Sequence, residues 1–142
     1  MEKITKNFTL DELVYSPTAK RLGIDNTPTE DVKEKLIILA QTLLQPIRDD
    51  WRSPIVVTSA YRSPQLNKAV GGSKTSQHMM GEAADLKVGD KEKNKKLFNL
   101  INKLMQQGKI KVGQLIDEYN YSWVHVSLPR VNKPNNQVLH LK

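Results

Sequence analysis

Residues 76–85 read SQHMMGEAAD, and residues 123–127 read WVHVS. These two stretches hold two histidines and an aspartate, His78, Asp85 and His125, each close to apolar residues that are common in strands. A catalytic zinc site uses three such ligands and keeps one coordination position open, whereas a structural zinc site is closed by four ligands, usually including cysteine. The chain contains no cysteine. The pattern therefore predicts a metal site that carries out chemistry.

The periodicity of strands tells us where these side chains should point. Side chains alternate across a strand, so His125 is expected to share a face with Trp123 and Ser127. Asp85 is expected to share a face with Lys87 in the same way. Each candidate ligand then lies on the more polar face of a strand whose other face is core. From spacing alone, metal ligands and ordinary core or surface residues both remain possible interpretations.

Length and composition indicate a single domain. The chain has 142 residues, of which 38% are hydrophobic, enough for one core, and we expect residues 1–142 to form one domain.

The N-terminus has no apolar stretch of the signal-peptide kind, and no run approaches the roughly 20 apolar residues of a membrane span. We therefore expect no membrane span and a cytoplasmic location in the producing cell.

The charge is strongly positive, at +7 from 22 basic and 15 acidic residues. This balance favours anionic polymers such as nucleic acid or bacterial wall material, and it equally suits a solubilising surface. The basic residues are scattered and lack the interleaved aromatic residues of a nucleic-acid platform. We expect a monomer with no nucleic-acid partner.

Several helices can be predicted from capping residues and apolar spacing. Residues 9–12 form a capping box that opens a short helix, which should stop near Ser16 and Pro17. Thr27 followed by Pro28 is expected to start the longest helix, which runs to about residue 50 with Pro46 kinking or ending its last turns. Further helices are expected over residues 63–70 and 90–107.

The remaining regular segments read as strands. Runs rich in β-branched residues predict strands at residues 54–60, 84–88, 112–119, 121–128 and 137–141. Short connections between them suggest antiparallel pairing, and the helices lie before and between them. We expect an α+β fold, a small antiparallel sheet flanked by helices.

Three motifs in the chain resemble those of one enzyme family. Residues 76–85 match the pattern S-x-H-x-x-G-x-A-x-D, and residues 59–64, SAYRSP, are similar to an upstream S-G-Y-R-S segment. Residues 114–118, QLIDE, followed by 123–127, are similar to the closing strands. In this order the motifs resemble the zinc D-Ala-D-Ala carboxypeptidases, relatives of vancomycin-resistance dipeptidases and phage endolysins. The resemblance implies the Hedgehog/DD-peptidase fold.

The same resemblance assigns roles to the motif residues. It implies that His78, Asp85 and His125 hold Zn²⁺, which would activate a water molecule and polarise the scissile carbonyl. Arg62 is similar to the family arginine that contacts the substrate carbonyl or carboxylate, where its charge would stabilise the developing oxyanion. These four residues form the expected centre of the site.

Two carboxylates are candidates for the general base. Glu118 matches the glutamate of the family's Q-L-I-x-E strand, so the resemblance implies that Glu118 takes the proton from water. Many relatives instead carry the catalytic glutamate three residues before the last histidine, where this chain has Ser122. Asp117 therefore stays open as a competing base.

Four further residues have expected places around the substrate. Ser76 and Gln77 are expected to hydrogen-bond to the peptide, with stabilisation of their own loop as the alternative. Tyr61 is expected to bind substrate as part of the pocket wall, with Trp123 as another part of it. His140 matches no motif, and we expect it to be a strand residue and not a ligand.

The sequence thus predicts a zinc peptidase that cleaves bacterial peptidoglycan peptides, either a D-Ala-D-Ala carboxypeptidase or an endolysin-type endopeptidase. A phage or prophage lysin that reaches the wall after release is the preferred setting, with a host wall-recycling enzyme as the other. Two histidines and a carboxylate also suit iron oxygenases, although the seven-residue step to Asp85 argues against them. The last alternative is a non-catalytic zinc module that binds wall peptide, and the presence of Glu118 and Arg62 favours catalysis.

Overall fold

The computed structural model describes residues 3–141. Its strands form one sheet in the order β1-β2-β4-β3-β5, with bounds β1 Val56–Ser59, β2 Ala83–Lys87, β3 Gln114–Glu118, β4 Trp123–Ser127 and β5 Gln137–Leu141. The helical segments are α1 Leu10–Val14, α2 Pro17–Leu22, α3 Glu30–Leu39, the π-helix η1 Ala40–Leu44, α4 Gln45–Trp51, α5 Pro64–Ala69, the 3-10 helix η2 Gln77–Met80 and α6 Lys91–Gln106. The α+β class expected from the sequence is confirmed.

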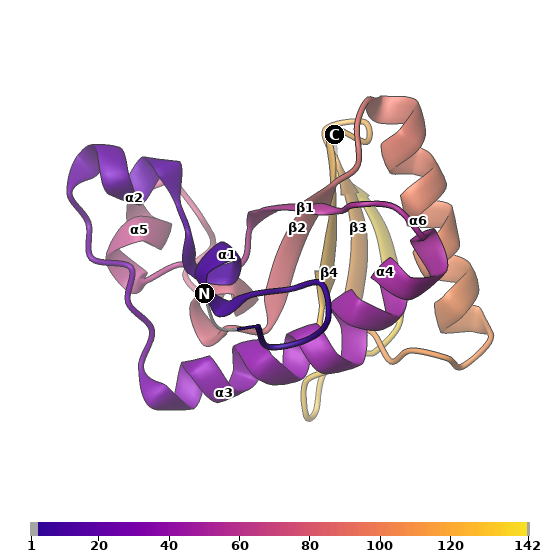
Figure 1. Cartoon of the computed structure of the whole chain (residues 1–142), viewed down its shortest axis with the longest axis horizontal. Helices are drawn as coiled ribbons and strands as arrows, with labels where there is room; N and C mark the ends of the chain where they lie inside the picture. Colours follow the sequence, from indigo (N-terminus) through magenta and orange to yellow (C-terminus); the bar gives the residue numbers. More distant parts are fainter. Residues whose placement is uncertain (1–2, 142) are drawn as a thin grey trace.

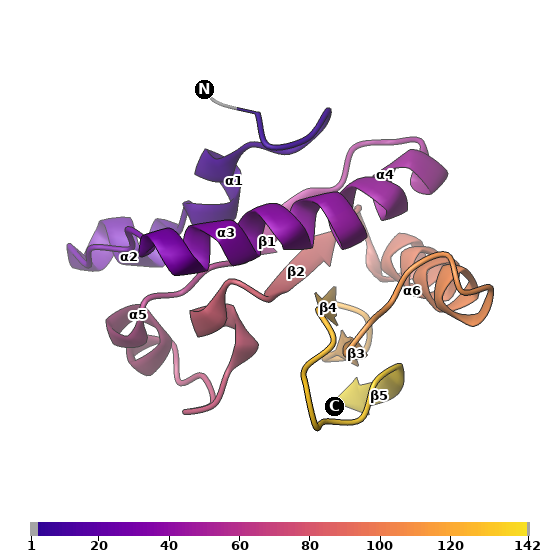
Figure 2. The ribbon, with the colours of Figure 1, turned by 90° about the horizontal axis from the view of Figure 1, so that it is seen from below.

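The two faces of the sheet are covered differently. Helix α6 lies along one face with α4 beside it, and the segment between α5 and β2 lies on the other (Figure 1, Figure 2). Buried apolar side chains fill the space between the sheet and the helices. The strands contribute Ala84, Leu86, Leu115, Val124 and Val126, and the helices contribute Leu36, Leu39, Leu43, Ile47, Leu97 and Ile101.

The pairing of the strands is mostly antiparallel. β2 pairs with β1 and β4, and β4 pairs with β3, all in antiparallel fashion. The expectation of antiparallel pairing is wrong for β5, which runs parallel to β3. The topology explains this difference, because β4 ends beside the start of β3. A chain that leaves β4 there and joins the free edge of β3 must run in the direction of β3.

The long helix begins later than predicted, and it has an irregular turn just before Pro46. Its N-cap is Thr29, whose hydroxyl accepts the Val32 N–H at 3.3 Å, whereas the hydroxyl of Thr27 donates to Asp25 at 2.7 Å. Pro46 does not end the helix, because the preceding turn widens into the π-helix η1 and α4 continues to Trp51. The wider turn accommodates a proline that has no N–H to donate.

A short helix, α2, was not expected. Ser16 and Pro17 follow the end of α1, as expected, but they also start α2, where the Ser16 hydroxyl accepts the Ala19 N–H at 3.1 Å. Proline is well suited to the first helical position, because its missing N–H would be unpaired there in any case.

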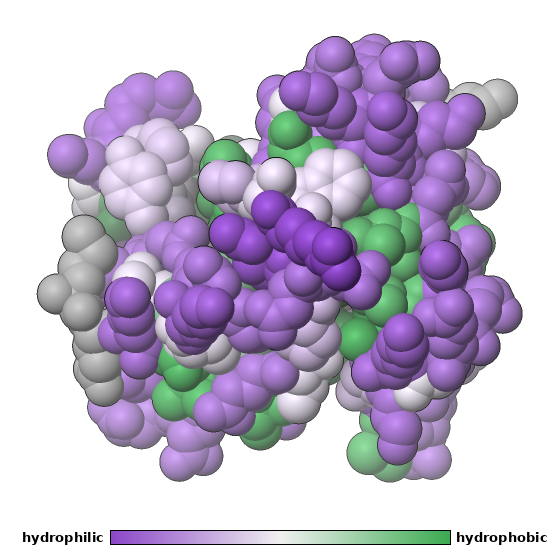
Figure 3. All heavy atoms as spheres, turned by 45° about the vertical axis from the view of Figure 1, so that its right-hand side comes forward, coloured by the Kyte–Doolittle hydropathy of each residue, from purple (hydrophilic) through white to green (hydrophobic). Residues whose placement is uncertain are grey.

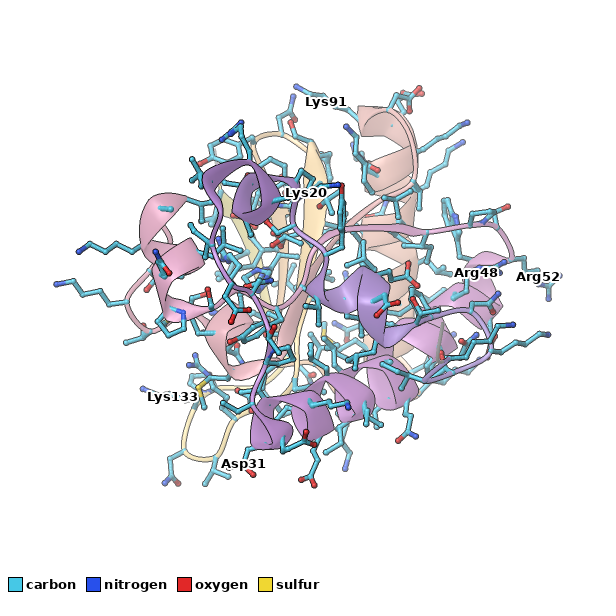
Figure 4. All side chains as sticks on the ribbon, turned by 60° about the vertical axis from the view of Figure 1, so that its left-hand side comes forward. Lys20, Asp31, Arg48, Arg52, Lys91 and Lys133 are labelled. Atoms are coloured by element: carbon cyan, nitrogen blue, oxygen red, sulfur yellow. The ribbon has the colours of Figure 1, made fainter. Side chains whose placement is uncertain are left out.

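The surface carries dispersed charge. Figure 3 shows hydrophilic side chains over most of one side, with hydrophobic residues in separate patches. Labelled basic residues such as Arg52, Lys91 and Lys133 extend outward from different parts of the chain (Figure 4). Within residues 3–141, no helix has the length and apolar character needed to cross a membrane.

Candidate metal centre

Three elements bring the predicted ligands together. His78 lies in η2, Asp85 in β2 and His125 in β4, and one ligand atom from each lies within 4.8 Å of the other two. Asp85 Oδ1 lies 3.4 Å from His78 Nε2 and 3.0 Å from His125 Nδ1. The β2–β4 register places Asp85 directly opposite His125, so the sheet itself makes this part of the cluster. Two imidazoles and a carboxylate at this spacing could hold a metal ion.

The orientation of His78 is set by the backbone next to it. Its Nδ1 lies 2.6 Å from the carbonyl oxygen of Ala60, which can only accept, so Nδ1 carries the proton and Nε2 is left with a lone pair. The carbonyl of His78 in turn accepts the Arg62 N–H at 3.1 Å. These two bonds join η2 to the segment after β1 and direct Nε2 toward Asp85. A fixed tautomer of this kind is typical of histidines that bind metals.

Gly81 makes the sharp turn from η2 into β2. Its φ is 71°, in the left-handed region, and a Cβ at this position would lie 2.8 Å from the backbone oxygen of Val32. Both the conformation and the space therefore require glycine. The turn brings His78 and Asp85, seven residues apart, to the same point.

The charge of Asp85 is stabilised by its neighbours. Burial by itself raises the pKa of Asp85, but the neighbouring imidazoles of His125 and His78 lower it by more, so the pKa lies well below its ordinary value. The carboxylate is therefore ionised at neutral pH, the form that binds a cation.

The cluster lies in the floor of an open cavity of about 590 Å³. Alternate residues of β3 and β4 line it, namely Gln114, Ile116 and Glu118 from β3 and Trp123 and His125 from β4. The segment between α5 and β2 forms the opposite wall with Ser76 and Gln77 among its residues, and Arg62 also lines the cavity. An open, polar cavity of this size admits a peptide.

Glu118 lies beside the cluster. Its Oε2 is 3.9 Å from His125 Nδ1 and accepts a hydrogen bond from Trp123 Nε1 at 2.9 Å. The ring of Tyr119 packs against the indole of Trp123, with centroids 5.1 Å apart. The carboxylate of Glu118 is thus held at one end of the cavity.

Asp117, the competing base, points to the other face of the sheet. It is buried, accepts the backbone N–H of Tyr121 at 3.3 Å and is paired with His140 of β5. These contacts stabilise the turn between β3 and β4 and leave Asp117 away from the cavity. His140 lies on that same side of the sheet, as the partner of Asp117, and is not among the three clustered ligands.

Arg62 keeps its charge inside the cavity. Its Nη2 donates to the Ser76 hydroxyl at 3.4 Å, and its buried Nε–H has no hydrogen-bond partner among residues 3–141. Burial lowers the pKa of Arg62, while the charges of Asp85 and Glu118 oppose that change. Arginine remains protonated at any physiological pH, so the site retains a fixed cation.

The structure shows where Tyr61 and Gln77 lie and adds another residue to the cavity. Tyr61 is buried in the core and is not among the residues that line the cavity, and its backbone N–H donates to the carbonyl of Leu13 at 2.9 Å. Gln77 lines the cavity, but its Nε2 donates to the carbonyl of Leu128 at 3.0 Å, so its amide anchors a loop. Arg130 also lines the cavity and was not predicted, because nothing in the sequence shows where the segment after β4 runs.

A comparison with known protein families agrees with this geometry. The sequence profile described as Peptidase M15 matches residues 6–127. The chain belongs to the peptidase M15 family. A comparison with curated proteins finds no match. Membership supports a metallopeptidase and favours hydrolysis over the iron-oxygenase alternative, and zinc is the metal on which the peptidases of this family depend.

Proposed function

We propose that this chain is a zinc peptidase that hydrolyses peptides of bacterial peptidoglycan. The observation that carries the proposal is the convergence of His78 Nε2, Asp85 Oδ1 and His125 Nδ1 in the floor of an open cavity, with Glu118 next to them. When bound by these three residues, zinc supplies a Lewis acid that activates water and polarises a carbonyl.

Glu118 acts as the general base. Its carboxylate lies 3.9 Å from a ligand nitrogen, close enough to take a proton from a water molecule at the cluster and later to give it to the leaving amine. Trp123 holds one oxygen of this carboxylate through its indole N–H, which limits the positions that Glu118 can take. Trp123 is therefore a positioning residue.

Arg62 stabilises negative charge on the substrate. Its guanidinium lines the same cavity and is held by Ser76, which also caps η2 by accepting the His78 N–H at 3.2 Å. A fixed cation near the scissile carbonyl lowers the energy of the charge that develops on its oxygen. Ser76 thus connects η2, which carries His78, to Arg62.

The wider setting follows from the same proposal. We propose that residues 1–142 act as one catalytic domain and that the substrate is a wall peptide. The proposed setting is a phage or prophage lysin that acts on the wall after release, with a host wall-recycling enzyme as the alternative. Net charge of +7 suits a polymer with anionic groups. Both carboxypeptidase and endopeptidase activity are compatible with a cavity that is open to solvent.

The test combines metal analysis with product analysis. Purified protein supplied with zinc is expected to contain one zinc per chain, and its incubation with purified muropeptides should give fragments whose masses identify the cleaved bond. His125→Ala is the matched control and should lose both zinc and activity. Zinc and peptide binding without cleavage would leave a non-catalytic module, and the absence of zinc would end the proposal.

A further inference from the structure

Arg130 lies at the end of the cavity opposite Glu118. Strand pairing orders the cavity floor, with Glu118 opposite Trp123 at one end, Ile116 opposite His125 in the middle and Gln114 beyond them. Residues on one face of a strand repeat about every 7 Å, so the floor extends about that far past the ligands toward Gln114. Arg130 also lines the cavity, and the segment that carries it leaves β4 at Ser127, which is this far end of the floor.

The segment that carries Arg130 is held in place. The Leu128 carbonyl accepts from Gln77 Nε2 at 3.0 Å, and the Leu128 N–H donates to the Glu82 carbonyl at 2.8 Å. The ring of Pro129 fixes the φ of that residue, and the carbonyl of Arg130 accepts the Lys133 N–H at 3.4 Å. The backbone on both sides of Arg130 is therefore tied to η2, to the residue before β2 and to its own turn. A side chain presented from a fixed backbone loses less freedom on binding.

The two arginines of the cavity differ in their electrostatic partners. Arg62 feels the charges of Asp85 and Glu118, which offset its own. Arg130 takes part in none of the ion pairs formed among residues 3–141. The positive charge of Arg130 is thus not neutralised within the cavity and is available to an anionic group of the substrate.

We propose that Arg130 binds a carboxylate of the substrate peptide close to the scissile bond and thereby selects the substrate. The inference rests on the proposed peptidase function. Guanidinium matches carboxylate through two parallel hydrogen bonds, a geometry that lysine cannot provide. In wall peptides such a carboxylate comes either from the C-terminal D-alanine or from the α-carboxylate of a γ-linked D-glutamate. Arg62 is left to act at the reacting carbonyl.

The experiment compares three synthetic wall pentapeptides: the parent, its C-terminal amide, and the form with D-isoglutamine in place of D-isoglutamate. One of the two amide replacements should lower kcat/KM of the wild type by about 10- to 100-fold, mainly through KM. On the parent peptide, kcat/KM of Arg130→Gln should be lower than that of the wild type by the same factor. On the amide that matters, Arg130→Gln and the wild type should have equal kcat/KM. The replacement that matters identifies the source of the carboxylate.

Lys133→Gln is the matched control, since it removes one positive charge from the same segment and Lys133 extends away from the molecule (Figure 4). It should leave all three rates unchanged. Equal rates of the wild type on all three peptides would overturn the carboxylate site while the peptidase activity stands. So would an Arg130→Gln variant in which the loss caused by the amide and the loss caused by the substitution simply add.

Calorimetric titration of the same peptides into zinc-loaded protein separates the two proposals further. A preference for the parent that is lost in Arg130→Gln, without any cleavage, would support the role of Arg130 and contradict the proposed peptidase. Binding that is indifferent to both amides and to Arg130→Gln would overturn the carboxylate site.

Discussion

The two faces of the sheet are made from alternate residues of the same strands. One face packs in the core, and the other carries the candidate metal ligands. On the face toward α6 and α4, Leu86 and Val124 are fully buried in the core. On the cavity face, their chain neighbours Asp85 and His125 are the candidate ligands, and Trp123 also lines the cavity. One strand register therefore fixes both the packing and the direction of the reactive groups. Substitutions one residue apart should separate stability from chemistry.

The largest expected contrast is between Asp85→Ala and Leu86→Ala. Asp85→Ala removes the charged ligand between two imidazoles, so zinc affinity should fall by more than the roughly 10- to 100-fold that a supporting residue costs, and turnover should be lost. Leu86→Ala leaves a cavity in the core and should lower the free energy of unfolding by about 2–5 kcal/mol, with zinc content and kcat kept. Elemental analysis, urea unfolding and turnover measure the two effects.

Leu86→Val is the milder control if Leu86→Ala does not fold, and it should again reduce stability only. The two-face comparison would break if Asp85→Ala retained full zinc affinity, because β2 would then not supply a ligand. A normally folded Leu86→Ala variant that lost its zinc would equally show that the two faces are not independent.

The next contrast lies on β3, between Glu118→Gln and Asp117→Asn. Glu118→Gln keeps the size of the side chain but cannot accept a proton, so kcat should fall by roughly 10²- to 10⁴-fold with zinc content unchanged. Asp117→Asn weakens the buried contacts to Tyr121 and His140 and should cost about 1–3 kcal/mol of stability with kcat unchanged. Activity lost in Asp117→Asn and kept in Glu118→Gln would reverse the assignment of the base.

The strand part of this comparison could be predicted from the sequence. Alternation placed Asp85 and His125 on polar faces and Glu118 opposite in direction to Asp117, and the register of β2, β3 and β4 agrees with that placement. The α+β class and most element positions followed from capping residues and β-branched runs. Local patterns suffice here because each of these features is set within a few residues.

Features that depend on distant partners could not be predicted. The direction of β5 follows from where β4 ends in space. Tyr61 follows a strand whose continuation turns into the core, and Arg130 lines the cavity from a segment that Gln77 and Glu82, about 50 residues earlier in the chain, hold in place. Such contacts leave no periodic signal in the chain.

The smallest expected effect concerns Trp123, which acts on chemistry only through Glu118. Trp123→Phe keeps an aromatic ring against Tyr119 but removes the N–H that Glu118 Oε2 accepts at 2.9 Å. One hydrogen bond of this kind contributes about 1 kcal/mol, so kcat should fall by about 2- to 10-fold while KM and zinc content stay the same. In the Glu118→Gln background the same substitution should have a smaller effect, because the carboxylate that it positions is gone. An increase in KM with unchanged kcat would mean instead that Trp123 contacts the substrate, and the cavity face would then extend its binding surface to this end of the strands.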